Sequence, residues 1–197
     1  MKIGLYGGTF DPPHMGHLHI AEDFYKACGS DLLVVMPSFI PPHKQNSSTS
    51  ALFRYEMTKL TFLALGETGM NYTVSDYEIK KNDTSYTIET VNYLLDKYST
   101  EKISLCVGSD MLFCFEKWKC ADELMKKCVL YSKARSHGEY EKLCSHAEYL
   151  EENYGASVHI MKGTVLEVSS TYLRSSKDKN FLSCEVLNYI EKHGLYR

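Results

Sequence analysis

Short apolar runs alternate with segments of helical periodicity along this chain of 197 residues, and the alternation limits the fold more than any other feature. The runs with the length and composition of buried strands are residues 2–6, 32–36, 72–75, 103–108, 128–132 and 157–161. Strands separated by helices form parallel sheets, because each crossover returns the chain to the same end of the sheet. The pattern therefore predicts an α/β fold, a parallel sheet flanked by helices.

The predicted helices occupy the intervals between these runs. Apolar spacing places them at residues 17–28, 53–64, 88–98, 139–153, 170–176 and 184–193. Ser50 is a natural N-cap for the second of them, and the apolar face of that helix carries Phe53, Met57, Leu60 and Ala64. No repeat or linker divides the chain, so residues 1–197 are expected to form a single domain with a small C-terminal helical part.

The composition argues against several classes of protein. Hydrophobic residues make up 44% and charged residues 24%, an ordinary balance for a globular core, and the net charge of −3 disfavours a general nucleic-acid binder. No apolar stretch approaches the ~20 residues of a membrane span, so we expect no membrane partner. Seven cysteines without a Cys-x-x-Cys pair, among them Cys106 in an apolar run, indicate reduced thiols and predict a cytoplasmic protein.

Three unusual segments follow predicted strands. They are GGTFDPPHMGH (7–17), PSFIPPHK (37–44) and GSD (108–110). Parallel α/β sheets bind their ligands at the carboxyl ends of the strands, so these segments are expected to form one site at that edge.

The first of these segments has the residues of an anion site. Gly7 and Gly8 let a ligand approach the backbone closely, because glycine lacks a Cβ. His14 and His17 are three residues apart, so they project from one side of a helix that begins there, beside its free N–H groups. A lone histidine is more often a surface or core residue, but a pair in this loop indicates phosphate binding. The segment is neither a GxGxxG fingerprint nor a Walker A loop.

Two further segments add basic side chains. Lys44 follows a proline-stiffened loop and could reach a triphosphate as a mobile charge, although a loop lysine by itself is usually only solvated. In the segment EVSSTYLRSS, Ser169 or Ser170 can cap a helix, and Thr171 and Arg174 share a face with Ser170. Hydroxyls, N–H groups and a guanidinium would then converge on one phosphate, while a capped helix with an exposed arginine is an equally good interpretation.

Together the first loop and this last segment resemble a known superfamily. The loop reads G-x-F-D-P-x-H-x-G-H from Gly8 to His17, and the later segment reads S-S-T-x-x-R from Ser169 to Arg174. Both are similar to the nucleotidylyltransferase superfamily, and more closely to its bacterial nicotinate-nucleotide adenylyltransferase family. The likeness extends nearly end to end, through PPHK (41–44), SDYEIKKNDTSYT (75–87), VGSDML (107–112), FEKW (115–118) and YIEKHGLY (189–196). Ser183, where the family often has proline, and the loop at residues 45–50 depart from the pattern.

The resemblance implies a Rossmann-like fold and assigns roles to particular residues. The catalytic residues, on the ATP phosphates, would be His14, His17, Lys44 and Arg174. The ATP-binding residues would be Gly7, Gly8, Thr9 and Phe10 through their backbone, Gly108, Asp110 at the ribose hydroxyls, Ser170 and Thr171. Thr87 and Trp118 resemble the acceptor pocket, where the indole stacks on a pyridine ring and Thr87 receives its carboxylate.

The implied reaction is transfer of AMP from ATP to nicotinate mononucleotide, giving nicotinic acid adenine dinucleotide and pyrophosphate by direct in-line attack. Mg²⁺ is expected with ATP, and the sequence offers no dedicated metal ligands. Two alternatives stay open: the same chemistry on nicotinamide mononucleotide or another phosphorylated acceptor, and a nucleotide-binding module without activity. A homo-oligomer is compatible with the sequence.

Overall fold

The strands form one parallel sheet. The computed structural model describes residues 1–42, 49–136, 138–164, 166–176 and 178–196. Its strands are β1 (Ile3–Gly8), β2 (Leu32–Pro37), β3 (Tyr72–Val74), β4 (Ile103–Cys106), β5 (Cys128–Lys133) and β6 (Val158–Met161). They lie in the order β3-β2-β1-β4-β5-β6, and every neighbouring pair is parallel. This is the strand order of a Rossmann fold, so the predicted Rossmann-like α/β sheet is confirmed.

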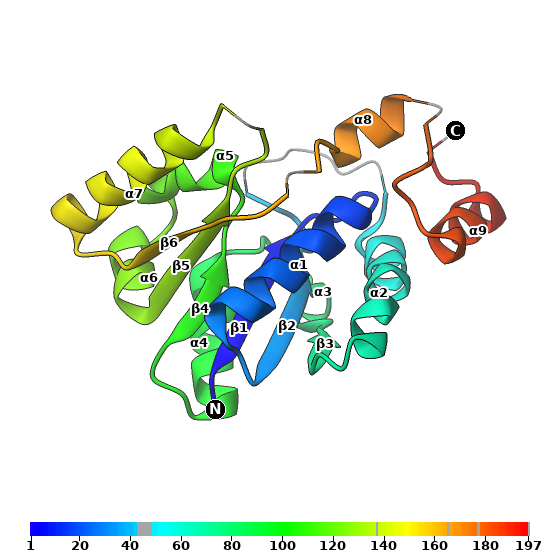
Figure 1. Ribbon diagram of the computed structural model, residues 1–197. Coiled ribbons are helices and arrows are strands. Elements are labelled where there is room, and N and C mark those ends of the chain that lie inside the picture. The colour runs from blue at the N-terminus through cyan, green and yellow to red at the C-terminus, as the bar shows by residue number, and fades with distance from the viewer. Residues whose placement is uncertain (43–48, 137, 165, 177, 197) are drawn as a thin grey trace.

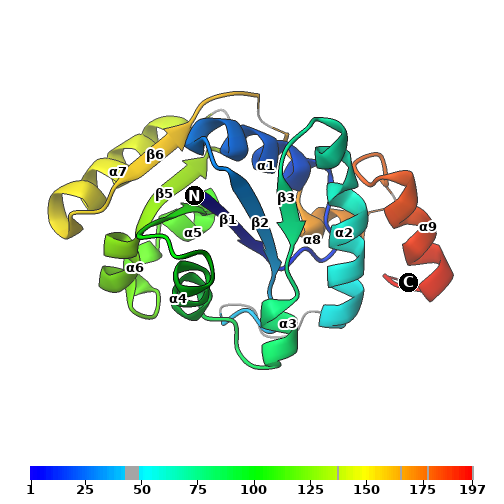
Figure 2. The ribbon, with the colours of Figure 1, turned by 90° about the horizontal axis from the view of Figure 1, so that it is seen from below.

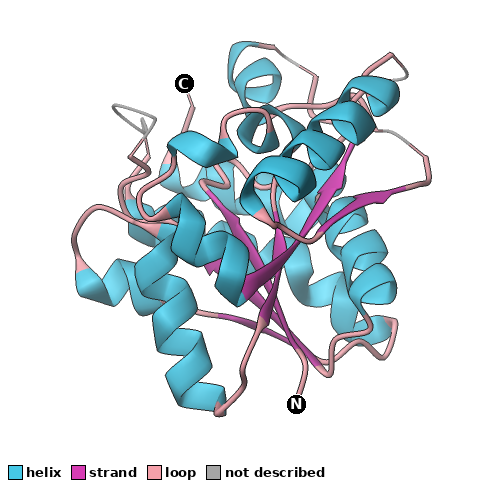
Figure 3. Ribbon diagram, turned by 90° about the vertical axis from the view of Figure 1, so that its left-hand side faces the viewer, coloured by secondary structure: helices cyan, strands magenta, loops and turns pink. Residues whose placement is uncertain are grey.

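Helices cover both faces of the sheet (Figures 1 to 3). Apolar side chains of α1 (Met15–Cys28) and α2 (Ala51–Glu67) share a core cluster with one face of the central strands. Those of α4 (Thr87–Tyr98), α6 (Ala121–Lys127) and α7 (Tyr140–Tyr154) share a second cluster with the opposite face. The central strands β1, β2, β4 and β5 are mostly buried, which explains why they read as continuous apolar runs, whereas the edge strands β3 and β6 are only partly buried. Cys106 lies in this core, as predicted.

Several short helices have no counterpart among the predicted elements. They are α3 (Tyr77–Lys81), α5 (Ser109–Leu112), the 3₁₀ turn η1 (Phe115–Lys117) and α6. Each is seven residues or shorter, too short for helical periodicity to show in the sequence. None of the helices in the described ranges has both the length and the apolar character needed to cross a bilayer.

Of the predicted apolar face of α2, Phe53, Met57 and Leu60 contact the C-terminal helix, whereas Ala64 packs on the sheet side. Met57 is buried with residues of α9 (Cys184–His193), and the ring of Phe53 lies 5.2 Å from that of His193. A second face, with Phe62 and Leu65, packs on the sheet. The prediction included only Ala64 of this second face, because Arg54, Thr58 and Thr61 are also buried and interrupt the apolar period. Ser50 does cap this helix, accepting a hydrogen bond from the Phe53 N–H.

The strands β1 and β4 separate at the carboxyl edge of the sheet, and the region between the loops that follow them is here called the crevice. The β1–β4 ladder ends at the pair Tyr6 and Cys106, whereas β1 stays paired with β2 through Gly8 and Pro37. Beyond Cys106 the chain turns toward β5, where the Val107 N–H donates to the Tyr131 carbonyl at 2.8 Å. The crossover connections leave β1 and β4 on opposite faces, so this is the topological switch point where such sheets bind ligands.

The core position of Phe62 generates a prediction on stability. Its buried ring contacts the rings of Tyr6 and Phe10, with centroids 6.3 and 5.9 Å away. Phe62→Ala should lower the free energy of unfolding by about 3–5 kcal/mol, because it leaves a cavity under the loop after β1. Leu63→Ala, at a side chain 56% exposed on the same helix, is the control and should stay within about 0.5 kcal/mol of the parent. Urea unfolding measures both, and equal losses would contradict the packing described.

Candidate active site

The loop after β1 is folded back on itself by Phe10. This residue has a φ of 51°, and its side chain is 1% exposed. A Cβ at Gly8 would lie 2.7 Å from the Phe10 ring, so glycine is required there to admit the ring. The predicted ATP contact of Phe10 can therefore involve only its backbone, because the side chain belongs to the core.

His14 and His17 meet at the start of α1, as their spacing predicted. His14 is the N-cap, and its N–H donates to Nδ1 of His17 at 3.1 Å. The two rings are stacked with centroids 3.7 Å apart. Because Nδ1 of His17 accepts this bond, the neutral His17 ring carries its proton on Nε2 and can donate it. The edge of Phe10 faces the His17 ring at 5.0 Å and fixes its plane.

Burial keeps His14 neutral. Its side chain is 5% exposed, and this desolvation, assisted by the nearby charge of Arg135, lowers the pKa of His14 from 6.5 to about 4. At neutral pH the ring therefore contributes a dipole and a hydrogen-bonding nitrogen to the site rather than a charge.

The segment from Ser169 to Arg174 docks directly on the loop after β1. It forms α8 (Ser170–Ser175), and Ser169 caps it by accepting from the Tyr172 N–H. Ser170 Oγ donates to the Pro12 carbonyl at 2.8 Å. Arg174 donates through Nη1 to the Asp11 carbonyl at 2.5 Å and through Nη2 to Thr171 Oγ1 at 3.2 Å. The structure thus brings Ser170, Thr171 and Arg174 beside the two histidines.

On the other side of the crevice, Gly108 and Asp110 begin α5, directly after β4. Asp110 is exposed and pairs with Arg135, whose Nη2 lies 3.0 Å from Asp110 Oδ1. A Cβ at Gly108 would lie 2.7 Å from that same nitrogen. Arg135 follows β5 and is a site residue that the sequence reasoning missed. Its position just after a predicted strand was the available signal, since the segments at 7–17 and 108–110 were found in that way.

Thr87 and Trp118 lie on neighbouring segments at the same edge of the sheet. Thr87 is the first residue of α4, and Trp118 ends η1 with its ring 4.8 Å from that of Phe115. Lys119 joins the two segments: its ammonium lies 3.8 Å from the Tyr86 ring centre and 3.2 Å from Glu89 Oε1. Trp118 is only partly buried against the core, so part of its ring remains accessible.

A buried arginine holds the first two loops together. Arg54 of α2 is 1% exposed. Its guanidinium donates to the carbonyls of Thr9 at 2.6 Å, Phe39 at 2.8 Å and Thr49 at 3.3 Å. Burial lowers the pKa of Arg54, and the nearby Asp11 acts in the opposite direction. The sequence reasoning missed this residue, because a single arginine in a helix is normally exposed.

The connection from β6 to α8 is anchored on α1. Lys133, buried at the end of β5, donates to Asp23 and to the Thr164 carbonyl, the latter at 2.6 Å. His19 Nε2 lies 3.0 Å from the same carbonyl. Further along the chain, the Val168 side chain lies close to Gly16. An added Cβ at Gly16 would lie 2.7 Å from it. These contacts set the direction in which α8 reaches the loop after β1.

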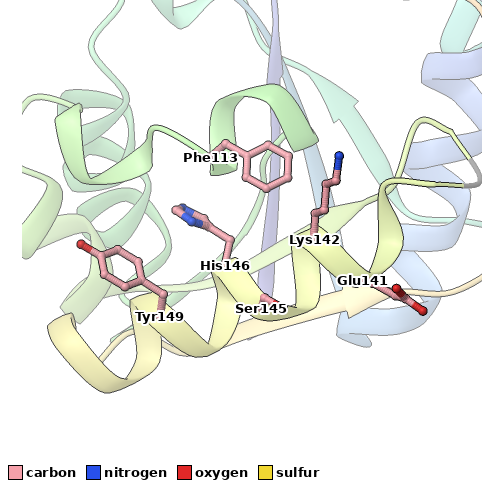
Figure 4. A pocket seen from close by; sticks show the side chains of 6 residues that line it. All are labelled: Phe113, Glu141, Lys142, Ser145, His146 and Tyr149. Atoms are coloured by element: carbon pink, nitrogen blue, oxygen red, sulfur yellow. The ribbon is translucent and has the colours of Figure 1, made fainter.

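Two other features lie outside this constellation. Lys44 belongs to residues 43–48, which are outside the described residues, so its predicted place at the phosphates stays a prediction. A hollow of about 530 Å³ lies over α7 and is lined by Phe113, Glu141, Lys142, Ser145, His146 and Tyr149 (Figure 4). It contains none of the residues assigned to the phosphates, the nucleosides or the acceptor, so it is separate from the candidate active site. In the described part of the chain, no group of three or more His, Cys, Asp or Glu side chains is placed to hold a metal ion.

The sheet has the Rossmann strand order, whose switch point binds nucleotides in many proteins. The chain matches the cytidylyltransferase-like family over residues 5–176 and belongs to that family.

Within it, the similar curated proteins are nicotinate-nucleotide adenylyltransferases. A protein named probable nicotinate-nucleotide adenylyltransferase from Clostridium botulinum (strain Eklund 17B / Type B) is 33% identical over 202 residues, covering 100% of this chain and 98% of that protein. One of the same name from Caldicellulosiruptor bescii is 33% identical over 205 residues, with 100% of both covered. The resemblance found in the sequence is thereby confirmed.

The fold is also shared with a solved structure. The nicotinic acid mononucleotide adenylyltransferase of Plasmodium falciparum, complexed with NaAD, superposes with a TM-score of 0.77 at 17% identity. The alignment covers 99% of this chain and 97% of that one. At this identity the likeness establishes the fold.

The lowered pKa of His14 generates a prediction on pH. The folded-state pKa of about 4 lies below the ordinary 6.5, so between these values the unfolded chain binds a proton that the folded chain does not. His14 should therefore lower stability as the pH falls through that window, by on the order of 3 kcal/mol when the fall is complete. In His14→Asn, urea unfolding at a series of pH values should show a shallower loss.

Arg135→Gln tests the cause of this shift. Because the Arg135 charge contributes to lowering the pKa, its removal should move the His14 titration upward in an NMR measurement.

Stability curves of the parent and His14→Asn that stay parallel from pH 7 to about pH 4 would contradict the neutral assignment.

Proposed function

We propose that this protein transfers the adenylyl group of ATP to nicotinate mononucleotide, forming nicotinic acid adenine dinucleotide and releasing pyrophosphate. The observation that carries the proposal is the convergence of stacked His14 and His17 with Arg174 at the switch point between β1 and β4. The family membership and the names of the full-length relatives support the acceptor.

The geometry suits charge stabilisation rather than covalent catalysis. The attacking group is the acceptor's phosphate, already an anion, so the reaction needs neither a general base nor a protein nucleophile. What it needs is alignment of the two substrates and donors for the charge that develops on the triphosphate. The Nε2–H of His17, the N–H groups at the start of α1 and the guanidinium of Arg174 supply such donors. Lys44 is proposed to join them.

The remaining assigned residues would hold the two nucleosides. On the ATP side, the backbone of Gly7, Gly8, Thr9 and Phe10 with Gly108 lines the crevice, and the exposed carboxylate of Asp110 can accept from ribose hydroxyls. Arg135, which pairs with that carboxylate, places a guanidinium beside the crevice. On the acceptor side, the Thr87 hydroxyl and the N–H groups at the start of α4 can receive a carboxylate, while the Trp118 ring offers a stacking face.

Mg²⁺ enters this scheme with ATP, as part of the substrate. The donors around the crevice are mainly imidazoles, guanidiniums and hydroxyls, a set that does not suit a hard cation. The triphosphate and water would therefore supply most of its ligands.

Pyrophosphate release tests the proposal. The purified protein is given Mg²⁺-ATP with either nicotinate mononucleotide or nicotinamide mononucleotide. Release with the acid and little with the amide is the expected result, because only the acid carries the carboxylate that Thr87 would bind. Equal release with both would support a broader range of acceptors. ATP binding without release with any phosphorylated acceptor would favour the inactive module and overturn the proposal.

His17→Ala should lower kcat by about 10²–10³-fold and change the KM for ATP far less, since one donor to developing charge is typically worth that much. Steady-state kinetics separate the two parameters. His159→Ala, at an exposed position on β6, is the matched control and should behave as the parent. An effect of His17→Ala confined to KM would remove this histidine from charge stabilisation.

Trp118→Ala should weaken acceptor binding, with little change in the affinity for ATP. Loss of aromatic stacking costs about 1–3 kcal/mol, or roughly 5- to 150-fold in affinity. Calorimetry with each nucleotide separately measures this, and Trp118→Phe should recover part of the loss. Unchanged acceptor affinity in Trp118→Ala would show that the indole is only a core residue.

A further inference from the structure

The penultimate residue of the chain reaches the loop after β1. Tyr196 Oη donates to Asp11 Oδ1 at 2.6 Å, across 185 positions of sequence. The helix that precedes it, α9, is fixed against α2 by a cluster containing Met57, Val186 and Ile190 (Figure 1). The C-terminal segment also bonds to the start of α1, where the Met15 N–H donates to the Phe181 carbonyl at 2.8 Å. The C-terminus is thus part of the framework around the two histidines.

Asp11 connects this hydroxyl to the phosphate-binding side chains. Its side chain is buried, 4% exposed as a residue, and Oδ2 lies 4.0 Å from Nη1 of Arg174. The same Nη1 donates to the Asp11 carbonyl, so Asp11 holds Arg174 through both backbone and side chain. Asp11 also lies near Arg54 and favours its charged form. Any rotation of the Asp11 carboxylate would therefore change its interactions with both Arg174 and Arg54.

The chemistry of Tyr196 suits a permanent donor. Burial, together with the hydrogen bond to Asp11, raises the pKa of the Tyr196 hydroxyl well above its ordinary value. The hydroxyl is therefore protonated at neutral pH and can donate to the Asp11 carboxylate. Tyr196 also has a φ of 56°, in the left-handed region that aromatic residues rarely occupy. Such backbone strain persists where surrounding contacts fix the residue, and here they fix it with its hydroxyl on Asp11.

We propose that Tyr196 is a positioning residue for nucleotide binding: its hydroxyl fixes the Asp11 carboxylate, which in turn fixes Arg174 beside His14 and His17. The inference rests on the proposed function in one respect, that Arg174 meets the phosphates of ATP. It goes beyond that function by making the C-terminal segment, at the far end of the chain, a component of the ATP site.

Tyr196→Phe is the direct test, because it removes the hydroxyl and keeps the ring in the α2–α9 cluster. Mg²⁺-ATP affinity, measured by calorimetry without acceptor, should fall about 10-fold, as is typical when a partner that orients a binding group is lost. Tyr189→Phe is the matched control. It removes a hydroxyl from α9, where the Tyr189 ring packs on Phe53 and His193, and should leave the affinity unchanged.

A double-mutant cycle separates positioning from a merely structural role. If Tyr196 acts through Asp11, the variant carrying both Tyr196→Phe and Asp11→Ala should bind Mg²⁺-ATP no more weakly than Asp11→Ala alone. Asp11→Ala by itself removes the acceptor of this hydrogen bond and should reproduce the loss, and it supplies the test should Tyr196→Phe fail to fold. Thermal unfolding of each variant shows whether the folded state is retained.

The outcomes are distinct. Reduced affinity in Tyr196→Phe, retained affinity in Tyr189→Phe and a non-additive double variant support the proposal. Parental affinity in Tyr196→Phe, or full additivity with Asp11→Ala, overturns it. Because binding is measured without acceptor, a parent protein that binds ATP and releases no pyrophosphate would refute the proposed acceptor while leaving this test decisive.

Discussion

The buried charge of Arg54 is the interaction on which the arrangement of the site depends. Removing a guanidinium from water costs several kcal/mol unless its donors are satisfied and its charge is balanced. Carbonyls of Thr9, Phe39 and Thr49 accept its N–H groups, and Asp11 lies nearby. Because Thr9 follows β1 and Phe39 follows β2, one side chain fixes two loops relative to each other. The buried Arg54, which no nucleotide would contact, therefore fixes the position of the loop that carries the histidines.

The basic groups around the crevice differ in charge and in exposure. Burial lowers the pKa of His14 and keeps it neutral at neutral pH, whereas Arg135 and Arg174 are exposed guanidiniums. Because the His14 imidazole is neutral, the nearby charge of Arg135 does not repel it before a ligand binds. An anion bound beside His14 would favour its protonated form, which couples phosphate binding to an increase in positive charge at the point where negative charge accumulates.

Most of the fold was predictable because its signals are local. The central strands are mostly buried apolar runs, and each long helix has enough turns for its period to show. The predictions failed where that signal is absent. The helices α3, α5 and α6 are too short, and the sheet-facing side of α2 is interrupted by Arg54, Thr58 and Thr61, whose polar groups are buried. Burial of a polar residue depends on partners from elsewhere in the chain, which a period cannot reveal.

The sequence by itself determined the order of the strands along the chain, the loop after the first strand, and the meeting of His14 with His17. These depend on covalent spacing, since three residues of helix place two side chains on one face. The tertiary structure alone decided that Arg174 bonds to Asp11, 163 positions away, and that Tyr196 reaches the same residue from the C-terminus. Those contacts depend on how the helices pack on the sheet, and packing follows from the shape and burial of many side chains at once.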